Sequence, residues 1–376
     1  MNSEYLSVDE KFMLQAIALG EKARITAPPH PWVGCVITKD GHVVAEGFTQ
    51  PAGSQHAAIN ALAAAGTQAE GATVYLSLEP CGHYDQTQPC TDALIKAGVK
   101  RVVIAIEDPD GHVNGYGIKQ LREAGVSVTL GVCAAETSES LKPYLFQRTT
   151  KRPYCVAKAG ISVDGRIAAA DRASQWIRPA EARRDSHYLR AESQAIIIGS
   201  GAATIDKPYL TTRDVSPKPS QPLLRVVLDG KGVVLPPSPL LDISIAPTLI
   251  FTSKQCPIST LNTWKEAKIE YMILPATPDG EGVDLQLALD HLGKKGILQV
   301  IIEGGSTLLG NALNAHMIQK LVLYVGPRIL GDLGLPLFKN SKIKSLADAP
   351  QLSLINVKQI GECVRLDYEV LPLEVM

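Results

Sequence analysis

The sequence predicts an α/β protein made of two domains, and three observations support this fold class. The chain has 376 residues, which is about twice a typical domain length. Short apolar runs alternate with helical segments in both halves. A polar segment that ends in proline, "QRTTKRP" at 147–153, separates the two halves. We therefore expect one domain over residues 1–147, a linker over 148–153 and a second domain over 154–376.

The composition favours small-molecule partners. Apolar residues make up 45% and charged residues 20% of the chain, and the formal net charge is -1, so we expect no surface for nucleic acid. No apolar run approaches membrane-spanning length and no apolar leader opens the sequence, so we expect a cytoplasmic protein. The seven cysteines are an odd, scattered set, which argues against a disulfide framework and leaves room for a metal site.

The first half begins with a helix and a hairpin. Ser7 or Asp9 can cap a helix that extends to about Ile25, because apolar residues recur there at helical spacing. The strands "VGCVIT" and "HVVAEGF" flank the turn "KDG", which predicts a hairpin over 33–48. The alternation then continues with helices over 57–65, 90–98 and 117–124 and strands over 72–78, 99–106 and 126–131.

The second half repeats the alternation of strands and helices, without an internal repeat between the halves. Strands are expected near 154–162, 195–198, 224–228, 248–252 and 298–302, and helices near 179–191 and 306–315. The proline-rich segment "DVSPKPSQP" at 214–222 predicts a surface loop.

Three residues of the first half have the chemistry of a zinc site. His56 begins a helix, and Cys81 and Cys90 each follow a proline around a turn after a strand. One imidazole and two thiolates can occupy three corners of a tetrahedral zinc site and leave the fourth for water, as in catalytic zinc centres. A lone His56 is more often a core histidine, but the two Pro-Cys pairs make that interpretation less favoured. Zinc deaminases carry a glutamate two residues after such a histidine, and here that position is Ala58.

Six stretches resemble the bifunctional riboflavin-biosynthesis deaminase/reductase family, in the family's order and over nearly the whole chain. They are "PPHPWVGCVITKDGHVVAEGF", "SLEPCGHYDQTQPCTDALIKAGVKRVVIAIEDPD", "KAGISVDGRIA", "SQWIRPAEARRDSHYLRAESQAIIIGSG", "DKPYLTTR" and "IIEGGSTLLGNAL". The resemblance implies a cytidine-deaminase-like three-layer domain followed by a dihydrofolate-reductase-like α/β domain. In the family, the first domain deaminates a ribosylaminopyrimidine 5′-phosphate. The second uses NADPH to reduce the ribosyl group to ribityl.

The resemblance also shows where the deaminase half departs from the family. It implies that His56, Cys81 and Cys90 bind zinc, and all three are present. The proton-shuttling glutamate falls on Ala58, whose methyl group cannot transfer a proton. Further pocket positions are changed, to His30, Thr49, Asp85 and Gln86, whereas His83 is kept. Glu79 belongs to the family pattern and is a poor replacement for the missing glutamate. We expect a folded, zinc-binding domain that does not deaminate the family substrate.

The reductase half keeps more of the family pattern. The resemblance implies that the substrate is bound by Ser174, Arg190, Leu210, Arg213 and Glu303. It places on the cofactor Gly160, Trp176, Ala202, Asp206, Gly230, Gly304, Gly305, Ser306 and Thr307. The two arginines suit a phosphate group, and "EGGSTLLG" leads into a helix whose N–H groups can meet a pyrophosphate. Ala202 replaces a threonine and Lys207 an aspartate of the family. Lys158 and Asp164 also match, and their role is open between structural and functional.

Several functions are compatible with these residues. The leading hypothesis is an NADPH-dependent reductase of 5-amino-6-(5-phosphoribosylamino)uracil fused to an inactive deaminase domain. A paralogue that acts on another phosphoribosyl heterocycle, a competent bifunctional enzyme with an engineered Ala58, and a non-enzymatic zinc-stabilised scaffold are the alternatives. Retention of Arg190, Arg213 and Glu303 argues against the scaffold. We expect Zn²⁺ and NADPH as cofactors, a phosphoribosyl pyrimidine as substrate, and a homodimer or higher homo-oligomer formed through the reductase domain.

Overall fold

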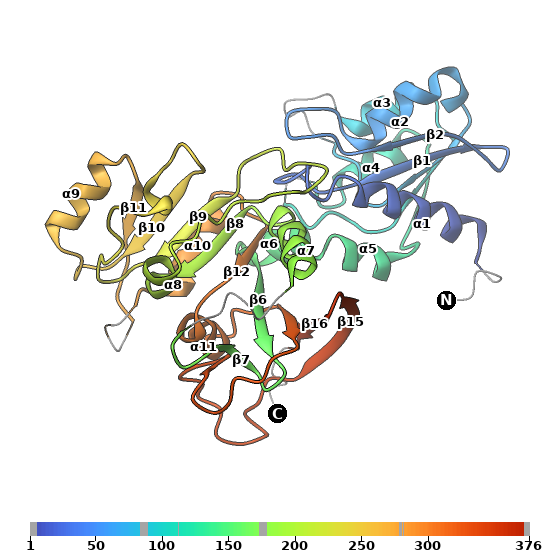
Figure 1. The fold of residues 1–376 in the computed structure, drawn as a ribbon. Coiled ribbons are helices and arrows are strands. Elements are labelled where there is room, and N and C mark those ends of the chain that lie inside the picture. Colours follow the sequence, from blue (N-terminus) through green and yellow to red (C-terminus); the bar gives the residue numbers. More distant parts are fainter. Residues whose placement is uncertain are drawn as a thin grey trace. The chain divides into compact units, whose positions relative to one another are not determined.

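The computed structural model consists of two α/β units, Met1–Lys151 and Arg152–Met376 (Figure 1). It describes residues 6–82, 89–111, 113–172, 179–277, 280 and 282–371. Both units combine a sheet with helices, so the predicted fold class is confirmed. None of the described helices is long and apolar enough to span a membrane.

The first unit contains a five-stranded sheet in the order β2-β1-β3-β4-β5. Strands β1 and β2 are antiparallel, whereas β3, β4 and β5 are parallel. The strands are β1 (Gly34–Lys39), β2 (His42–Phe48), β3 (Thr73–Leu76), β4 (Arg101–Ile104) and β5 (Ser127–Leu130). The helices are α1 (Val8–Glu21), α2 (Ala57–Ala65), the 3-10 helix η2 (Gly66–Ala69), α3 (Cys90–Lys96), α4 (Tyr116–Glu123), α5 (Ala134–Ser140) and α6 (Lys142–Thr150).

Local sequence explains how the first unit begins. Ser7 caps α1 through a capping box with Glu10. The helix ends at Glu21 and not at the predicted Ile25, because the amides of Lys22, Ala23 and Arg24 bond to the carbonyl three residues back, in tight turns, and not four residues back. The predicted hairpin is confirmed, with both residues of its Asp40–Gly41 turn at positive φ, as type I′ turns require.

Close backbone contacts set α2 against the sheet. A Cβ atom at Gly47 of β2 would lie 2.5 Å from the carbonyl oxygen of Ala57, so glycine is required for this approach. Alanines of α2 fill the small remaining space and join an apolar cluster that includes Cys35 and Cys90. The start of α2, with His56 just before it, is therefore held firmly at the end of the sheet.

The second unit contains a nine-stranded sheet in the order β11-β10-β9-β8-β12-β6-β13-β16-β15. Its strands are β6 (Tyr154–Ser162), β8 (Ala195–Gly199), β9 (Leu224–Leu228), β10 (Thr248–Thr252), β11 (Glu270–Ile273), β12 (Gln299–Ile302), β13 (Lys320–Gly326), β15 (Leu352–Ile360) and β16 (Cys363–Val370). A separate ribbon pairs β7 (Arg166–Ala168) with β14 (Leu335–Pro336). The helices are α7 (Ala180–Ala191), α8 (Ser200–Ile205), η3 (Pro239–Leu241), α9 (Ile258–Glu266), α10 (Leu285–Lys294) and α11 (Ser306–Asn314).

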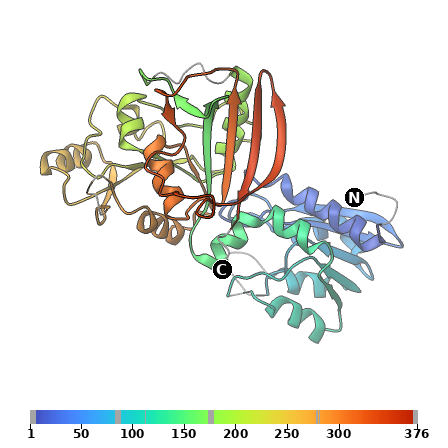
Figure 2. The same cartoon turned by 90° about the horizontal axis from the view of Figure 1, so that it is seen from below.

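The order of strands determines where this unit can bind a ligand. Strands from β11 to β13 are parallel, and β16 and β15 complete the sheet in antiparallel fashion (Figure 2). After β8 the chain adds β9, β10 and β11 outward on one side of β8. It then returns to form β12 on the other side, between β8 and β6. A parallel sheet binds ligands where its strand order reverses, outside the carboxyl ends of the strands. The residues that follow β8 and β12 are therefore brought together at this edge.

The polar segment predicted as a linker is partly helical. Its first residues, 147–150, form the last turn of α6, and Lys151 ends that helix at positive φ. The predicted surface loop over 214–222 carries no helix or strand. The domain bounds 1–147 and 154–376 stay a prediction.

Candidate metal centre and cofactor pocket

His56, Cys81 and Cys90 come together at one end of the first unit's sheet. The Nδ1 atom of His56 lies 3.5 Å from Sγ of Cys81 and 3.4 Å from Sγ of Cys90, and all three donor atoms lie within 4.8 Å of one another. Zinc bonds of about 2.0 Å to nitrogen and 2.3 Å to sulfur at tetrahedral angles separate the two donors by about 3.5 Å. The three residues thus fit a tetrahedral zinc ion that keeps one position for another ligand.

Backbone contacts hold the two cysteines in this position. Cys81 follows β3, and Cys90 is the first residue of α3 and donates its amide N–H to Sγ of Cys81 over 3.4 Å. A Cβ atom at Gly117 of α4 would lie 2.0 Å from the carbonyl oxygen of Pro80, so α4 supports the segment from behind. Hydrogen bonding from the Cys90 thiol, helped by His56 and opposed by burial, lowers the pKa of Cys81, whereas the bond to Cys81 and burial raise the pKa of Cys90. A thiolate is the form that binds metal.

Ala58 and Glu79 both lie near this end of the sheet. Ala58 has no carboxylate, and the carboxylate of Glu79 is already hydrogen-bonded. Ala58 is in the first turn of α2, is 2% exposed and belongs to the apolar cluster. Both carboxylate oxygens of Glu79 accept backbone N–H groups, from Asp108 at 3.2 Å, Gly115 at 2.9 Å and Ile118 at 3.2 Å. These bonds fasten the start of α4, so Glu79 has a structural role.

Of the other deaminase-pocket positions, the structure describes His30 and Thr49. The ring of His30 lies 6.1 Å from that of His56, centroid to centroid, so His30 is beside the metal ligands. Thr49 is buried, and its hydroxyl accepts the amide N–H of Val33 over 3.0 Å. Thr49 therefore anchors the segment that leads into β1. His83, Asp85 and Gln86 lie outside the described residues.

We predict about one zinc ion per chain in protein purified without chelator. Cys81→Ser and Cys90→Ser should each lower the zinc content well below one, because serine replaces a thiolate ligand by a weak one. Cys133→Ser is the matched control, since Cys133 lies outside the ligand group and should leave the zinc content unchanged. Elemental analysis of the three variants and the parent protein measures this. A parent protein without zinc would contradict the assignment.

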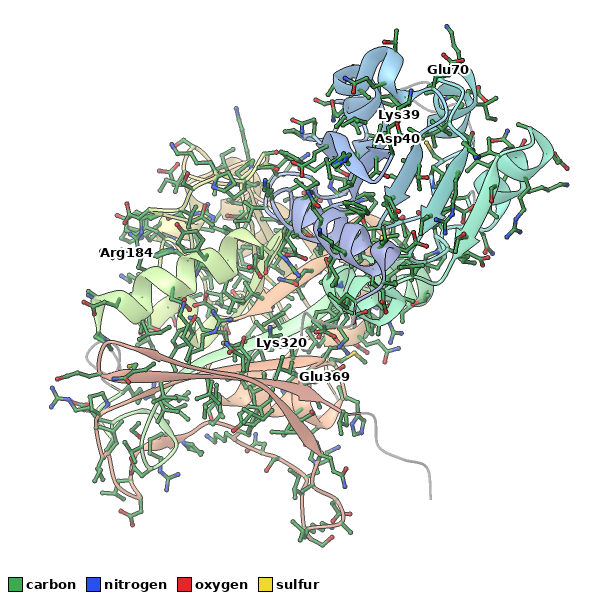
Figure 3. All side chains as sticks on the ribbon, turned by 90° about the vertical axis from the view of Figure 1, so that its right-hand side faces the viewer. Lys39, Asp40, Glu70, Arg184, Lys320 and Glu369 are labelled. Atoms are coloured by element: carbon green, nitrogen blue, oxygen red, sulfur yellow. The ribbon has the colours of Figure 1, made fainter. Side chains whose placement is uncertain are left out.

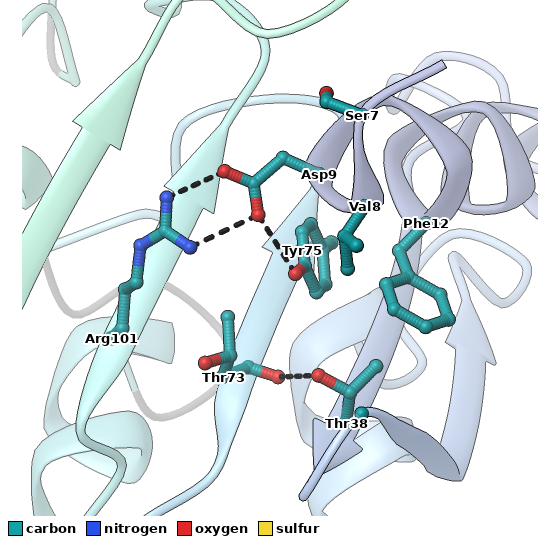
Figure 4. Close-up of a pocket in the computed structure, with 9 residues that line it drawn as sticks. Ser7, Val8, Asp9, Phe12, Thr38, Thr73, Tyr75 and Arg101 are labelled. Carbon is teal, nitrogen blue, oxygen red and sulfur yellow. Dashed lines mark hydrogen bonds and ion pairs between the residues drawn. The ribbon is translucent and has the colours of Figure 1, made fainter. Parts of the chain in front are cut away.

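A smaller hollow of about 360 Å³ lies in the same unit, at the amino-terminal ends of β3 and β4 (Figure 4). Arg101 donates to both carboxylate oxygens of Asp9, at 3.0 and 2.6 Å, and the Tyr75 hydroxyl donates to Asp9 over 2.9 Å. The side chains that line the hollow thus satisfy one another. This arrangement ties α1 to the sheet.

The second unit has a larger cavity of about 980 Å³ outside the carboxyl ends of its central strands. This volume is at the upper end of the range for ligand pockets. Eight residues expected to bind cofactor or substrate line it, namely Gly160, Ala202, Asp206, Glu303, Gly304, Gly305, Ser306 and Thr307. Gly305 caps α11, so the N–H groups that begin this helix can meet a pyrophosphate. The pocket fits a dinucleotide such as NADPH.

The remaining predicted residues do not line this pocket. Arg190, Leu210, Arg213 and Gly230 are described by the structure but are absent from the pocket wall. Leu210 is buried at positive φ, Arg213 is exposed, and a Cβ atom at Gly230 would lie 3.0 Å from the backbone of Gly282. Gly230 therefore permits close packing behind the wall, which Gly282 lines. Ser174 and Trp176 lie outside the described residues.

Glu303 joins the pocket to a group of cations. Its carboxylate accepts Nε of Arg190 at 2.6 Å, Nη2 of Arg190 at 2.9 Å and Nζ of Lys158 at 2.6 Å. Burial raises the pKa of Glu303, but the charges of Arg190 and Lys158 outweigh it and hold the pKa well below its usual range. The paired donors of Arg190 that the sequence suggested for a phosphate meet Glu303 here. The remaining guanidinium nitrogen of Arg190, Nη1, donates to the carbonyl oxygen of Thr211 over 3.1 Å.

The structure separates the two residues whose roles the sequence left open. Lys158 lines the cofactor pocket and its side chain is 3% exposed, which places it in the site. Asp164 accepts the hydroxyl of Ser162 and the amides of Leu330 and Gly331. These bonds lower the pKa of Asp164 to about 2 and fix a turn. Sequence reasoning also passed over His187, which lies three residues before Arg190 on α7.

Comparison with known proteins gives matches to both units. Residues 6–106 match the model of the cytidine and deoxycytidylate deaminase zinc-binding region, and residues 153–366 match that of the RibD C-terminal domain. The riboflavin biosynthesis protein RibD of Chlamydia pneumoniae is 43% identical over 363 residues, which cover 96% of this chain and 95% of that protein. RibD of Escherichia coli K12 is 38% identical over 369 residues, with 95% and 98% covered.

Solved structures are similar to this chain over nearly its whole length. RibD of Acinetobacter baumannii, form 1, has a TM-score of 0.88 at 32% identity and covers 97% of this chain and 99% of its own. A diaminohydroxyphosphoribosylaminopyrimidine deaminase/5-amino-6-(5-phosphoribosylamino)uracil reductase from Thermotoga maritima has a TM-score of 0.84 at 29% identity, with 97% and 99% covered. Similarity therefore extends through both units. The chain belongs to the RibD family of bifunctional riboflavin-biosynthesis proteins, with a deaminase-type zinc domain and a reductase domain, and its cofactors are Zn²⁺ and NADPH.

Proposed function

We propose that the second unit reduces 5-amino-6-(5-phosphoribosylamino)uracil to its ribityl product with NADPH. The observation that carries this proposal is that Lys158 and Glu303 line the cofactor pocket and that Glu303 is paired there with Lys158 and, behind the wall, with Arg190. The printed name of the Thermotoga maritima relative includes the same reductase activity. A buried carboxylate between two cations at the end of a cofactor pocket suits a polar, anionic substrate.

The residues of this unit would bind the reactants and hold a proton. NADPH supplies the hydride. The turn Gly304–Thr307 and the start of α11 would hold its pyrophosphate. Conversion of ribosyl to ribityl breaks the bond between C1′ and the ring oxygen, adds a hydride to C1′ and adds a proton to the released oxygen. Lys158 is the candidate proton donor, because it lines the pocket and its Nζ donates to Glu303 over 2.6 Å. Ala202 lacks the family's hydroxyl, which weakens cofactor binding by about 0.5–1.5 kcal/mol.

The test is NADPH oxidation in the presence of 5-amino-6-(5-phosphoribosylamino)uracil. We expect turnover by the parent protein, and a loss of at least about tenfold in kcat/KM for Arg213→Ala through weaker attraction of the phosphate. Arg184→Ala is the matched control, because Arg184 is an exposed residue of α7 (Figure 3) and should leave kcat/KM unchanged. Turnover with another phosphoribosyl heterocycle would instead identify a paralogue. No turnover with any of them would favour the scaffold.

We propose that the first unit binds zinc without deaminating the family substrate. Loss of a general acid/base costs roughly 10²- to 10⁴-fold in rate, and Ala58 supplies none. Glu79 is occupied by backbone N–H groups and cannot substitute for it. Zinc bound by His56, Cys81 and Cys90 would still stabilise the fold, because metal binding to a folded site adds to folding free energy.

We propose a homodimer, or a higher homo-oligomer, formed through the second unit. Strand β15 is the last strand of its sheet and exposes Leu352, Leu354, Ile355 and Val357 by 43–56%. An exposed apolar edge strand is a site where another chain can pair. Light scattering should give at least twice the chain mass, and Leu354→Lys with Val357→Lys should shift it toward the monomer. A monomeric parent protein would contradict the proposal.

We place the protein in the cytoplasm, where NADPH and a phosphoribosyl substrate are available. The seven cysteines are an odd, scattered set along the sequence, which suits a reducing compartment. The net charge of -1 supports small molecules, and not nucleic acid, as partners.

A further inference from the structure

His187 is a buried histidine with an unmet hydrogen-bonding atom. The residue lies on α7 and is 9% exposed. Within the part of the chain that the structure describes, Nδ1 of His187 has no hydrogen-bond partner. Buried polar atoms are nearly always paired, and an orphaned one calls for a specific explanation. A ligand that is present only in the working complex is one such explanation.

The charges around His187 indicate which ligand this is. Arg190 lies one helical turn further along α7, and Arg190, Arg213, Lys158 and Glu303 all act electrostatically on the imidazole. Three cations and one carboxylate leave a net charge of +2 among these four residues. A phosphate monoester carries about −1.5 to −2 at neutral pH, so it would neutralise the group.

The same surroundings keep the imidazole uncharged. Burial, followed by the charges of Arg190 and Arg213, lowers the pKa of His187 to about 4. A neutral imidazole can carry its single N–H on Nδ1 and donate it to an anion. Such a donor adds a directed hydrogen bond without adding another buried positive charge, which would be costly beside two arginines.

We propose that His187 binds the phosphate group of the reductase substrate, with Nδ1–H donating to a phosphate oxygen. This inference rests on the proposed reductase function and adds a residue to its phosphate site. Arg190 is held by Glu303, which leaves Arg213 and His187 as the groups that distinguish a phosphorylated from a dephosphorylated substrate. A core histidine without a ligand role would leave this distinction unaffected.

The test compares three substitutions at one position. Asparagine can place an amide N–H where Nδ1 lies, whereas glutamine reaches the position of Nε2 and leucine offers no donor. We expect His187→Leu and His187→Gln to raise KM for 5-amino-6-(5-phosphoribosylamino)uracil roughly 10- to 100-fold, the loss expected for a hydrogen bond to a charged group. His187→Asn should recover most of this loss. KM for the dephosphorylated compound should stay the same in all three variants.

A matched control is available in the same unit. His291 of α10 also has a buried ring nitrogen without a partner among the described residues, and its charged neighbours are Lys294, Lys295 and Glu270. His291→Leu should lower thermal stability to a similar degree as His187→Leu while leaving both KM values unchanged. Equal KM values in His187→Leu and the parent protein would overturn the inference.

A second measurement keeps the inference separate from the proposed function. The affinity of the full-length protein for inorganic phosphate can be measured by calorimetry, and this measurement requires no turnover. Weaker phosphate binding by His187→Leu, but not by His291→Leu, supports the phosphate site even if the parent protein fails to reduce the uracil substrate. Phosphate binding that is unchanged in His187→Leu would overturn the site even if the reductase is active.

Discussion

Glu303→Gln should reduce NADPH oxidation by at least about 100-fold and destabilise the second unit. Glu303 is the shared acceptor for two cations, Arg190 and Lys158, whose side chains are 14% and 3% exposed. Removing one partner of a buried ion pair leaves an uncompensated charge and costs about 3–5 kcal/mol. A glutamine carbonyl can accept from one of the two cations, but its amide group then faces the other. Turnover should fall because Lys158 and the substrate lose their fixed positions.

A pH series sharpens this test. The pKa of Glu303 is held below its unfolded value, so the carboxylate contributes stability above about pH 4.3 that is lost as the pH falls toward the folded pKa. Glu303→Gln should remove this part of the acid dependence of thermal unfolding. Glu270→Gln is the matched control, because Glu270 pairs with Lys295 at the surface and such pairs contribute little. A Glu303→Gln variant as stable and active as the parent protein would refute the assigned role.

Much of the fold could be predicted because local patterns and tertiary structure agree there. The helix over 57–65 and the strands over 154–162, 224–228 and 248–252 have the bounds that the sequence suggested. Each is a short apolar run that ends at glycine, proline or a polar group. Strand β15 was not predicted, since it is exposed on both faces and "LSLINVKQI" has no strict alternation. Residues 148–150, which the sequence places in a linker, form the last turn of α6, because a polar run at an exposed helix end looks the same in sequence as a linker.

The sequence predicts which residues form the site, but not which residues they pair with. Two thiolates and an imidazole indicate zinc by their chemistry alone, and the distances agree. The pairing of Arg190 with Glu303 joins residues 113 positions apart. No local pattern encodes such a contact, because it depends on α7 and β12 meeting in the folded unit. The same reason hides the unmet Nδ1 of His187 from sequence analysis.

Ala58→Glu alone should leave ammonia release from the family's aminated substrate negligible. Ala58 is 2% exposed within an apolar cluster, so the new carboxylate must be buried. Burial raises the pKa of a carboxyl unless a charge or hydrogen bond offsets it. The new side chain would also meet a changed pocket, in which His30 lies beside His56 and Thr49 is bonded to Val33. A substrate bound slightly out of place loses much of the benefit of positioning.

Recovery should begin only when His30→Asn, Thr49→His and Gln86→Lys accompany Ala58→Glu. These changes rebuild the substrate contacts that the family pattern implies, and the glutamate then has a bound substrate to which it can transfer a proton. Ala58→Gln in the same background is the matched control, because glutamine has the same size but cannot transfer a proton. Ammonia release should be measured on zinc-loaded protein for the single, quadruple and control variants. A fast Ala58→Glu single variant would show that the pocket is competent and that Ala58 is its sole defect.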